Sequence, residues 1–297
     1  MFWLLIAFVT PVLHGLANII DEYFVNKIFK NIRVLIFLNV LLDFILGLII
    51  FLIKTPSLPS LSTLPFLVII SLIEILYVVP YFLALKSNDT SVVISLFSLG
   101  NILVPVLAFF IVGELLNFHQ YVGFFIIVLS GFLLSFEPKK KLKVNVSFLY
   151  MFLCSVMLSV ETVLYKYVCN LADWSANFVW MIFISFLFVN IFLLFSKKYR
   201  NEVRQELPRF KPKAGLLLFG GLLSFIGQLS AIYVISLIPV TLEQGINASQ
   251  PIFVLLYAII LSKKFPNTFK ENIDKKSILK KIVLFVFIII GIIITLK

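Results

Sequence analysis

The chain has 297 residues, of which 61% are hydrophobic and only 13% charged, and it contains 33 phenylalanines. A soluble domain of this size could not hide so much apolar surface from water, so the composition excludes an ordinary soluble protein and predicts an integral membrane protein. The formal net charge of +11 comes from lysines and arginines in connectors between apolar segments, not from one basic domain or face, which argues against nucleic-acid binding.

Ten apolar segments follow one another along the chain, each close to the ~20 residues that a helix needs to cross a bilayer core of ~30 Å. They span residues 2–21, 33–53, 64–85, 90–112, 117–136, 146–168, 175–196, 214–238, 241–262 and 280–296. The wide connector at 137–146 divides them into two sets of five. We therefore predict an all-α integral membrane protein with ten transmembrane helices.

The two halves of the chain resemble each other in an ordered series of short matches. In chain order these pair Phe8–Asn26 with Phe152–Asn170, Tyr81–Leu85 (YFLAL) with Tyr233–Leu237 (YVISL), and the segment around Gly131 with that around Gly291. Because five is an odd number, the second copy enters the membrane from the opposite side. The sequence thus predicts two inverted five-helix repeats, residues 1–138 and 146–297, an arrangement common in transporters.

The distribution of basic residues predicts the orientation of the chain. By this segmentation, 22 of the 25 lysines and arginines lie in or beside the odd-numbered connectors, and Lys54, Lys166 and Lys297 are the exceptions. The positive-inside rule then places both termini outside the cell and the odd connectors in the cytoplasm. The expected location is a bacterial-type cytoplasmic (inner) membrane.

Short motifs along the whole chain resemble the drug/metabolite transporter superfamily, specifically its ten-helix EamA-type members. The matching residues are His14-Gly15, Ala84-Leu85, Asp89-Thr90, Gly113-Glu114, Gln120, Gly123, Gly131 and Gln250-Pro251, whereas Lys263-Lys264 replaces the usual Gly-Glu ending. The resemblance implies an exporter or exchanger of small metabolites, drugs or amino acids that works without ATP. Many members of this family keep both termini in the cytoplasm, whereas the charges here favour the reverse.

Polar residues inside the apolar segments form stripes at helical spacing on the first, third, fourth, sixth, eighth and ninth segments. Such residues are costly in lipid and usually face a cavity or a partner. The predicted substrate-binding residues are His14, Asn18, Tyr77, Tyr81, Ser98, Asn101, Gln228, Tyr233, Asn247 and Gln250. Interhelical hydrogen bonding is the competing interpretation of the amides, and hydrogen bonding to the helix backbone that of the serines. For His14 it is a hydrogen-bonded histidine within the helices, and for Tyr77 and Tyr81 it is a place in the core or at the membrane interface.

Three carboxylic acids are candidates for proton coupling. Glu74 ranks first, because it sits in the middle of an apolar segment on one face with Tyr77 and Tyr81. Glu161 ranks second, although Lys166 could neutralise it in a structural pair. Asp43 ranks third, since no other polar stripe is assigned to its segment. By contrast, Asp21, Glu22 and Glu243 are expected near membrane ends, in contact with water.

These features together predict a secondary transporter that works by alternating access, with proton coupling as an option, and not an enzyme. The alternatives are a membrane-embedded lipid-modifying enzyme and a non-transporting scaffold. No phosphate-cradling loop and no metal-ligand spacing occurs in the sequence, so no cofactor and no metal are expected. The expected partners are a small-molecule substrate, protons in the coupled case, the lipid bilayer, and a second copy of the chain if it forms a homodimer.

Overall fold

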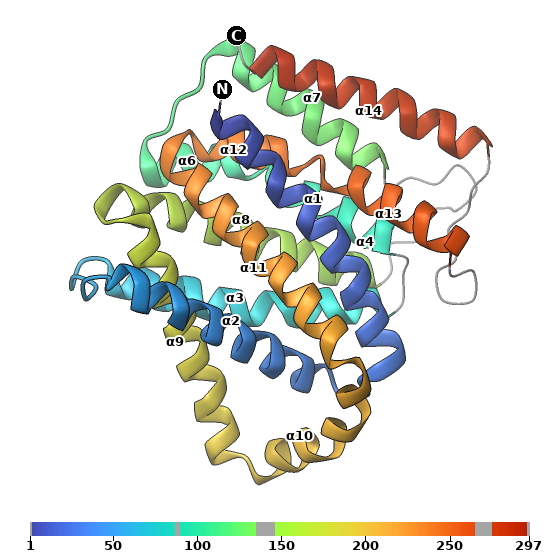
Figure 1. Cartoon of the computed structure of the whole chain (residues 1–297). Coiled ribbons are helices and arrows are strands. Elements are labelled where there is room, and N and C mark those ends of the chain that lie inside the picture. The colour runs from blue at the N-terminus through green and yellow to red at the C-terminus, as the bar shows by residue number, and fades with distance from the viewer. Residues whose placement is uncertain (1, 87–89, 135–145, 265–274, 296–297) are drawn as a thin grey trace.

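A computed structural model describes residues 2–86, 90–134, 146–264 and 275–295 (Figure 1). These residues form helices and contain no β-strand, so the prediction of an all-α protein is confirmed. In the part of the chain described, seven helical stretches are long and apolar enough to cross a membrane, and two further apolar helices are shorter. This fits a multi-pass membrane protein, while the number of ten crossings stays a prediction.

Every predicted segment falls on one or more helices. The first half contains α1 (Phe2–Tyr23) with a π-helical turn (Phe24–Ile28), α2 (Ile32–Lys54), α3 (Leu64–Leu85), α4 (Thr90–Leu96), α5 (Ser98–Asn101), α6 (Val104–Val112) and α7 (Phe118–Leu134). The second half contains α8 (Val146–Leu171), α9 (Trp174–Phe195), α10 (Lys197–Phe210), a 3₁₀ turn (Lys211–Lys213), α11 (Ala214–Leu237), α12 (Val240–Asn247), α13 (Gln250–Lys264) and α14 (Lys275–Thr295).

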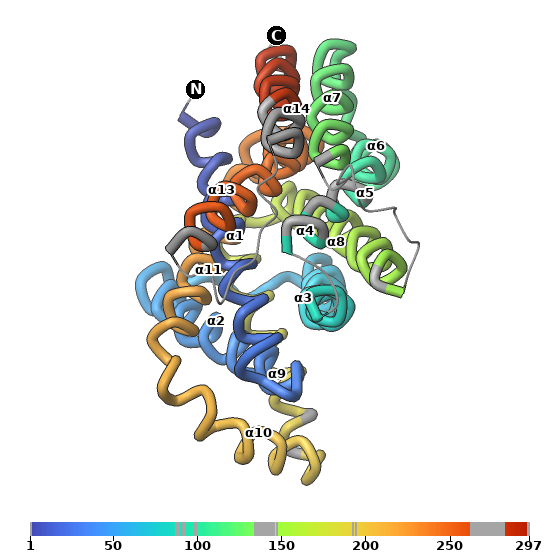
Figure 2. Tube along the Cα trace, turned by 90° about the vertical axis from the view of Figure 1, so that its right-hand side faces the viewer, coloured from blue at the N-terminus to red at the C-terminus, as the bar shows by residue number. Residues whose placement is uncertain are grey.

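The most extensive helix contacts join elements that are far apart in the sequence. They pair α7 with α14, α1 with α11 and α3 with α8, and α2 also packs against α9. Figures 1 and 2 show α7 and α14 side by side along one edge of the bundle, with α10 at the opposite edge. One buried apolar cluster contains residues of α1, α2, α3 and α4 from the first half and of α8, α11 and α13 from the second, and it includes the fully buried rings of Phe24 and Phe82. Helices from both halves therefore surround the centre of the molecule.

The contact between α7 and α14 depends on a pair of glycines. A Cβ atom at Gly123 would lie 2.5 Å from the carbonyl oxygen of Gly291, and one at Gly291 would lie 2.9 Å from the carbonyl oxygen of Gly123. Small residues at such crossings let helix backbones approach closely in a membrane. Each glycine thus makes room for the other helix.

Two of the predicted segments are not single helices. Segment 90–112 is broken at Phe97 and at Ile102–Leu103, and segment 241–262 is broken at Ala248–Ser249. A proline follows two of these three breaks: Pro105 lies in the first turn of α6, after Ile102–Leu103, and Pro251 lies in the first turn of α13, after Ala248–Ser249. A proline has no backbone N–H and clashes with the preceding turn, so it starts a helix more readily than it continues one. The prediction of two continuous helices here was wrong.

The predicted connector at 197–213 is largely the helix α10. Tyr199, Val203, Glu206 and Phe210 recur at helical spacing, and the Tyr199 hydroxyl donates to the backbone oxygen of Arg33 at 3.0 Å. Phe210 stacks on Phe29, with ring centroids 6.2 Å apart. The helix therefore packs its apolar face against the turn between α1 and α2.

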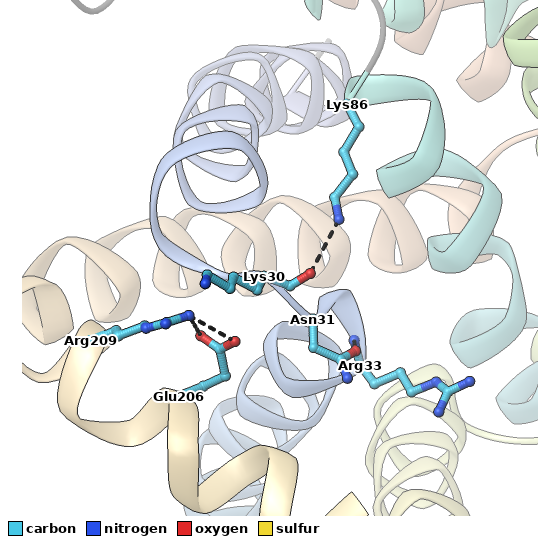
Figure 3. Close-up of polar contacts among 6 residues, drawn as sticks. All are labelled: Lys30, Asn31, Arg33, Lys86, Glu206 and Arg209. Atoms are coloured by element: carbon cyan, nitrogen blue, oxygen red, sulfur yellow. Dashed lines mark hydrogen bonds and ion pairs between the residues drawn. The ribbon is translucent and has the colours of Figure 1, made fainter.

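Basic residues gather where α10 meets this turn, as Figure 3 shows. Lys86 Nζ donates to the backbone oxygen of Lys30 at 3.4 Å, and Arg209 Nη1 lies 3.3 Å from Glu206 Oε1. This end of the bundle thus brings together basic residues from the first and third connectors and from α10.

Opposite charges hold the tight corner between α11 and α12. The Glu114 carboxylate accepts hydrogen bonds from the backbone N–H groups of Val240, at 2.8 Å, and Thr241, at 3.0 Å, at the start of α12. The Lys166 ammonium donates to the backbone oxygens of Ile235 and Ile238 at 2.9 and 3.0 Å, at the end of α11. An acidic group at the N-terminus of a helix and a basic group at the C-terminus of a helix each stabilise that helix by about 0.3–1 kcal/mol. This corner is therefore fixed by a charge from the connector between α6 and α7 and by one from α8.

Candidate functional site

A cavity of about 270 Å³ lies among the helices of both halves. Residues of α1, α2, α3, α4, α5, α8, α9, α11, α12 and α13 line it. Eleven of the thirteen predicted site residues are among them: His14, Asn18, Asp43, Glu74, Tyr77, Tyr81, Asn101, Glu161, Gln228, Asn247 and Gln250. The volume is near the lower end of the ~300–1,000 Å³ typical of small-molecule pockets. The space suits a small solute.

Two glutamates from different halves face each other across this cavity. Gln228 Nε2 donates to Glu74 Oε1 at 3.0 Å, and the carboxyl group of Glu161 lies within hydrogen-bonding reach of that of Glu74. Glu161 is only 4% exposed, and its Oε2 has no hydrogen-bond partner. Two carboxyl groups can hydrogen-bond to each other only when they share a proton.

The suggested pairing of Glu161 with Lys166 does not occur. The Lys166 ammonium is directed to the carbonyls at the end of α11 instead. The five-residue separation turns the two side chains about 140° apart around α8, which explains why they face different neighbours.

Asp43 also lines the cavity and lies near enough to Glu74 for an electrostatic interaction. It is half-buried, and Asn39, one turn earlier on α2, lines the same cavity. No polar stripe is predicted above for this segment, yet the i, i+4 spacing of Asn39 and Asp43 was a signal for one.

A second polar group lies on α1 and α3. The Tyr81 hydroxyl donates to Asn18 Oδ1 at 3.0 Å, while Asn18 Nδ2 is buried with no partner. Asp21 is half-buried and lines the cavity close to Tyr81. The expected place of Asp21 near a membrane end stays a prediction, and the structure adds that its side chain is half-buried at the cavity.

The broken helices meet at the cavity. Asn101, at the end of α5, donates to the backbone oxygen of Gln244 on α12 at 3.4 Å. Asn247 and Gln250 flank the break between α12 and α13, and Asn247 Oδ1 is buried without a hydrogen-bond partner. Ser98 is at the start of α5, but its side chain lies outside the described residues.

Serines of α8 satisfy backbone groups near the breaks. Ser155 Oγ donates to the carbonyl oxygen of Leu96 at 3.1 Å, and Ser159 Oγ to that of Gly100 at 2.7 Å. Such carbonyls need partners, since lipid offers none. These two serines therefore have a structural role, as the competing interpretation held.

His14 combines a place at the cavity with a packing role. Its Nε2 lies 3.1 Å from the backbone oxygen of Ser224. A Cβ atom at Gly227 would come within 2.5 Å of the His14 ring, so the glycine makes room for the imidazole where α1 crosses α11.

Among the predicted site residues whose side chains the structure describes, Tyr233 alone does not line the cavity. Its ring packs edge-on against Trp174, with centroids 5.1 Å apart. Gln228, which does line the cavity, is five residues earlier, or about 140° around α11. Tyr233 therefore belongs to a different face of that helix.

Glu243 is the third buried glutamate of the second half. It is 1% exposed and accepts a hydrogen bond from Gln244 Nε2 at 3.0 Å, but it does not line the cavity. The expectation that it lies in water was wrong, because its helix packs among α1, α6 and α7. Within the described ranges, no group of three or more His, Cys, Asp or Glu residues could hold a metal ion.

The helical fold and the seven long apolar stretches of the described residues fit the class of all-α, multi-pass membrane proteins. A protein of known crystal structure shares the fold, with a TM-score of 0.65 and 16% sequence identity over 99% of this chain and 98% of that one. At this identity the similarity shows the fold alone. The sequence matches no protein-family model, and no curated protein matches it significantly.

Proposed function

We propose that this protein is a secondary transporter that moves a small solute through the membrane by alternating access, in exchange for protons. The observation that carries the proposal is the central cavity, where Glu74 of the first half faces Glu161 of the second. Ionisable residues within membrane helices usually serve ion or substrate pathways. The resemblance to EamA-type transporters agrees with this interpretation.

The helix contacts support the inverted repeat on which this mechanism depends. If α8, α9, α11 and α14 are the counterparts of α1, α2, α3 and α7, the contact of α1 with α11 corresponds to that of α8 with α3. The contacts of α2 with α9 and of α7 with α14 then each join a helix to its own counterpart. Two like halves, 1–138 and 146–297, could rock against each other around the cavity.

The breaks in the helices support the same pairing. Phe97, at the first break of segment 90–112, and Ser249, at the break of segment 241–262, are 152 residues apart, as are Tyr81 and Tyr233 of the matching sequence motifs. Discontinuous helices at corresponding positions of two repeats are typical of transporter binding sites. The cavity at these breaks is therefore the solute site in our proposal.

Flux measurements test the proposal. The purified protein in liposomes with an imposed pH gradient is expected to move at least one member of a panel of amino acids, sugars and organic cations faster than empty vesicles do. Collapse of the gradient with a protonophore should remove the driven component. A panel without any flux above the empty vesicles would contradict transport.

Orientation is a separate part of the proposal. The basic residues around the α1–α2 turn, Lys86 and α10 lie at one end of the bundle (Figure 3), and the positive-inside rule assigns such an end to the cytoplasm. Both termini are then outside. A reporter fused after Lys297 that is active only in the periplasm should give a signal, and a signal from a cytoplasm-only reporter at the same position would refute this orientation.

A further inference from the structure

The charge of the cavity is opposite to that of the whole chain. The chain carries a formal net charge of +11, yet the described residues that line the cavity include four carboxylic acids and neither lysine nor arginine. The four acids are Asp21, Asp43, Glu74 and Glu161. A site of this kind attracts positive charge and repels carboxylates.

The surroundings of the Glu74–Glu161 pair supply no cation. The titratable groups that interact with the pair are Asp43 of α2, Tyr77 of α3, and Cys154 and Tyr165 of α8. All four are acids. The imidazole of His14 also lines the cavity, but its Nε2 is engaged by the backbone of Ser224. Among the residues described, nothing at the cavity carries the positive charge that would balance two ionised glutamates.

Polar atoms without partners indicate the kind of ligand that would fit. Glu161 Oε2 and Asn247 Oδ1 are buried acceptors with no donor, and Asn18 Nδ2 is a buried donor with no acceptor. Leaving such groups unsatisfied is costly, and more so for charged ones. A ligand with several N–H donors at one end and an acceptor elsewhere would satisfy both kinds of group.

Aromatic side chains complete the lining. Tyr77, Tyr81, Tyr165 and Phe97 all border the cavity. Aromatic faces attract cations and also pack against apolar ligand bodies. This lining suits an ammonium group attached to an apolar or aromatic body.

We propose that the solute is a small organic cation, a protonated primary amine, whose ammonium group binds between Glu74 and Glu161 in place of the proton that the two carboxyl groups share. Its binding releases that proton, so the amine and the proton compete for one site. The movement of the amine across the membrane rests on the proposed function above, whereas its binding does not.

Binding to the purified full-length protein in detergent tests the ligand class with three matched compounds. Tyramine carries only the ammonium group, tyrosine carries an ammonium and a carboxylate, and para-hydroxyphenylpropionate carries only the carboxylate. Tyramine is expected to bind at least ~10-fold more tightly than the other two, because charge-assisted hydrogen bonds to a buried carboxylate are strong. Calorimetry in two buffers of different ionisation enthalpy should also detect a proton released with each tyramine bound.

Variants locate the binding. Glu161→Gln and Glu74→Gln should each weaken tyramine binding by at least ~10-fold and remove the proton release. Glu243→Gln is the matched control, since Glu243 is buried like Glu161 but lies outside the cavity lining. Thermal unfolding of each variant checks that it is folded. If only one of the two glutamate variants folds, the proton release measured with that variant decides whether the ammonium group displaces the shared proton.

The inference is overturned if tyramine fails to bind in the millimolar range, if either carboxylate compound binds as tightly, or if both glutamate variants bind tyramine like the unaltered protein. Its failure can be told apart from failure of transport. Tyramine binding without flux in liposomes would contradict transport and leave the ligand class intact. Flux of carboxylate solutes without tyramine binding would contradict the ligand class and leave the transport proposal intact.

Discussion

Replacing Glu74 with glutamine is expected to reduce pH-driven solute flux into liposomes by more than about tenfold, because an ionisable group in a membrane pathway is what lets a proton gradient do work. Glutamine has nearly the shape of glutamate and can still accept the hydrogen bond from Gln228 Nε2, which is 3.0 Å from Glu74 Oε1. The substitution thus removes the titrating proton while it preserves the local packing.

The design separates coupling from folding and binding. Flux is measured with and without a pH gradient, and Glu243→Gln serves as a control for the loss of a buried carboxyl group outside the cavity. The control should keep its response to the gradient. If the Glu74 variant responds to pH as the unaltered protein does, Glu74 is not the coupling group.

Gly100→Ala is expected to destabilise the fold by about 1–3 kcal/mol or more, the usual range for overpacking a well-packed site. A Cβ atom at Gly100 would lie 2.2 Å from the carbonyl oxygen of Ser155 and 2.6 Å from its carbonyl carbon. These are backbone atoms of α8, so the clash cannot be relieved by a side-chain rotation. The hydrogen bond from Ser159 Oγ to the Gly100 carbonyl, 2.7 Å long, would be strained as α5 moves away.

Gly215→Ala gives the matched comparison. Gly215 lies in the first turn of α11, and a Cβ atom there has nothing within 4 Å. Alanine is favoured over glycine in a helix by roughly 0.5–1 kcal/mol, so this variant should be as stable as the unaltered protein or slightly more so. Unfolding followed by tryptophan fluorescence compares the two. Equal stability of both variants would show that α5 and α8 are not in close contact.

Much of the helical architecture follows from local sequence. Runs of about 20 apolar residues predict buried or membrane helices whatever their neighbours, and each predicted segment is helical. The breaks at Phe97 and Ser249 were missed because mean hydropathy over about 20 residues does not register an interruption of one or two residues. Pro105 and Pro251 were a signal that a new helix begins near each break. The helix α10 was missed for the opposite reason: its polar composition suggested a connector, whereas its packing on the α1–α2 turn depends on tertiary contacts.

In the candidate site too, local sequence predicts some features, whereas others depend on tertiary contacts. Helical spacing places Glu74, Tyr77 and Tyr81 on one face of α3, and all three line the cavity. Spacing does not tell which helix lies opposite, so the approach of Glu161 to Glu74 and the direction of Lys166 could not be predicted. These depend on contacts between residues of different halves, for which a single sequence carries no signal.

The separation of these partners along the chain also bears on how the protein is made. Glu74 on α3 accepts a hydrogen bond from Gln228 on α11, which follows 154 residues later in the chain. α3 therefore reaches the bilayer before α11 has been translated. At the bilayer centre, a charged residue costs roughly 2.5–3.5 kcal/mol on insertion scales, and each leucine, isoleucine, phenylalanine or valine offsets about 0.3–0.6 kcal/mol of that. The helices that carry Asp43 and Glu74, α2 and α3, are the two most apolar of the seven stretches in the described chain that could cross a membrane. The apolar side chains of α2 and α3 thus offset the cost of inserting Asp43 and Glu74 into lipid. Both helices can enter the bilayer before the residues that complete the cavity have been synthesised.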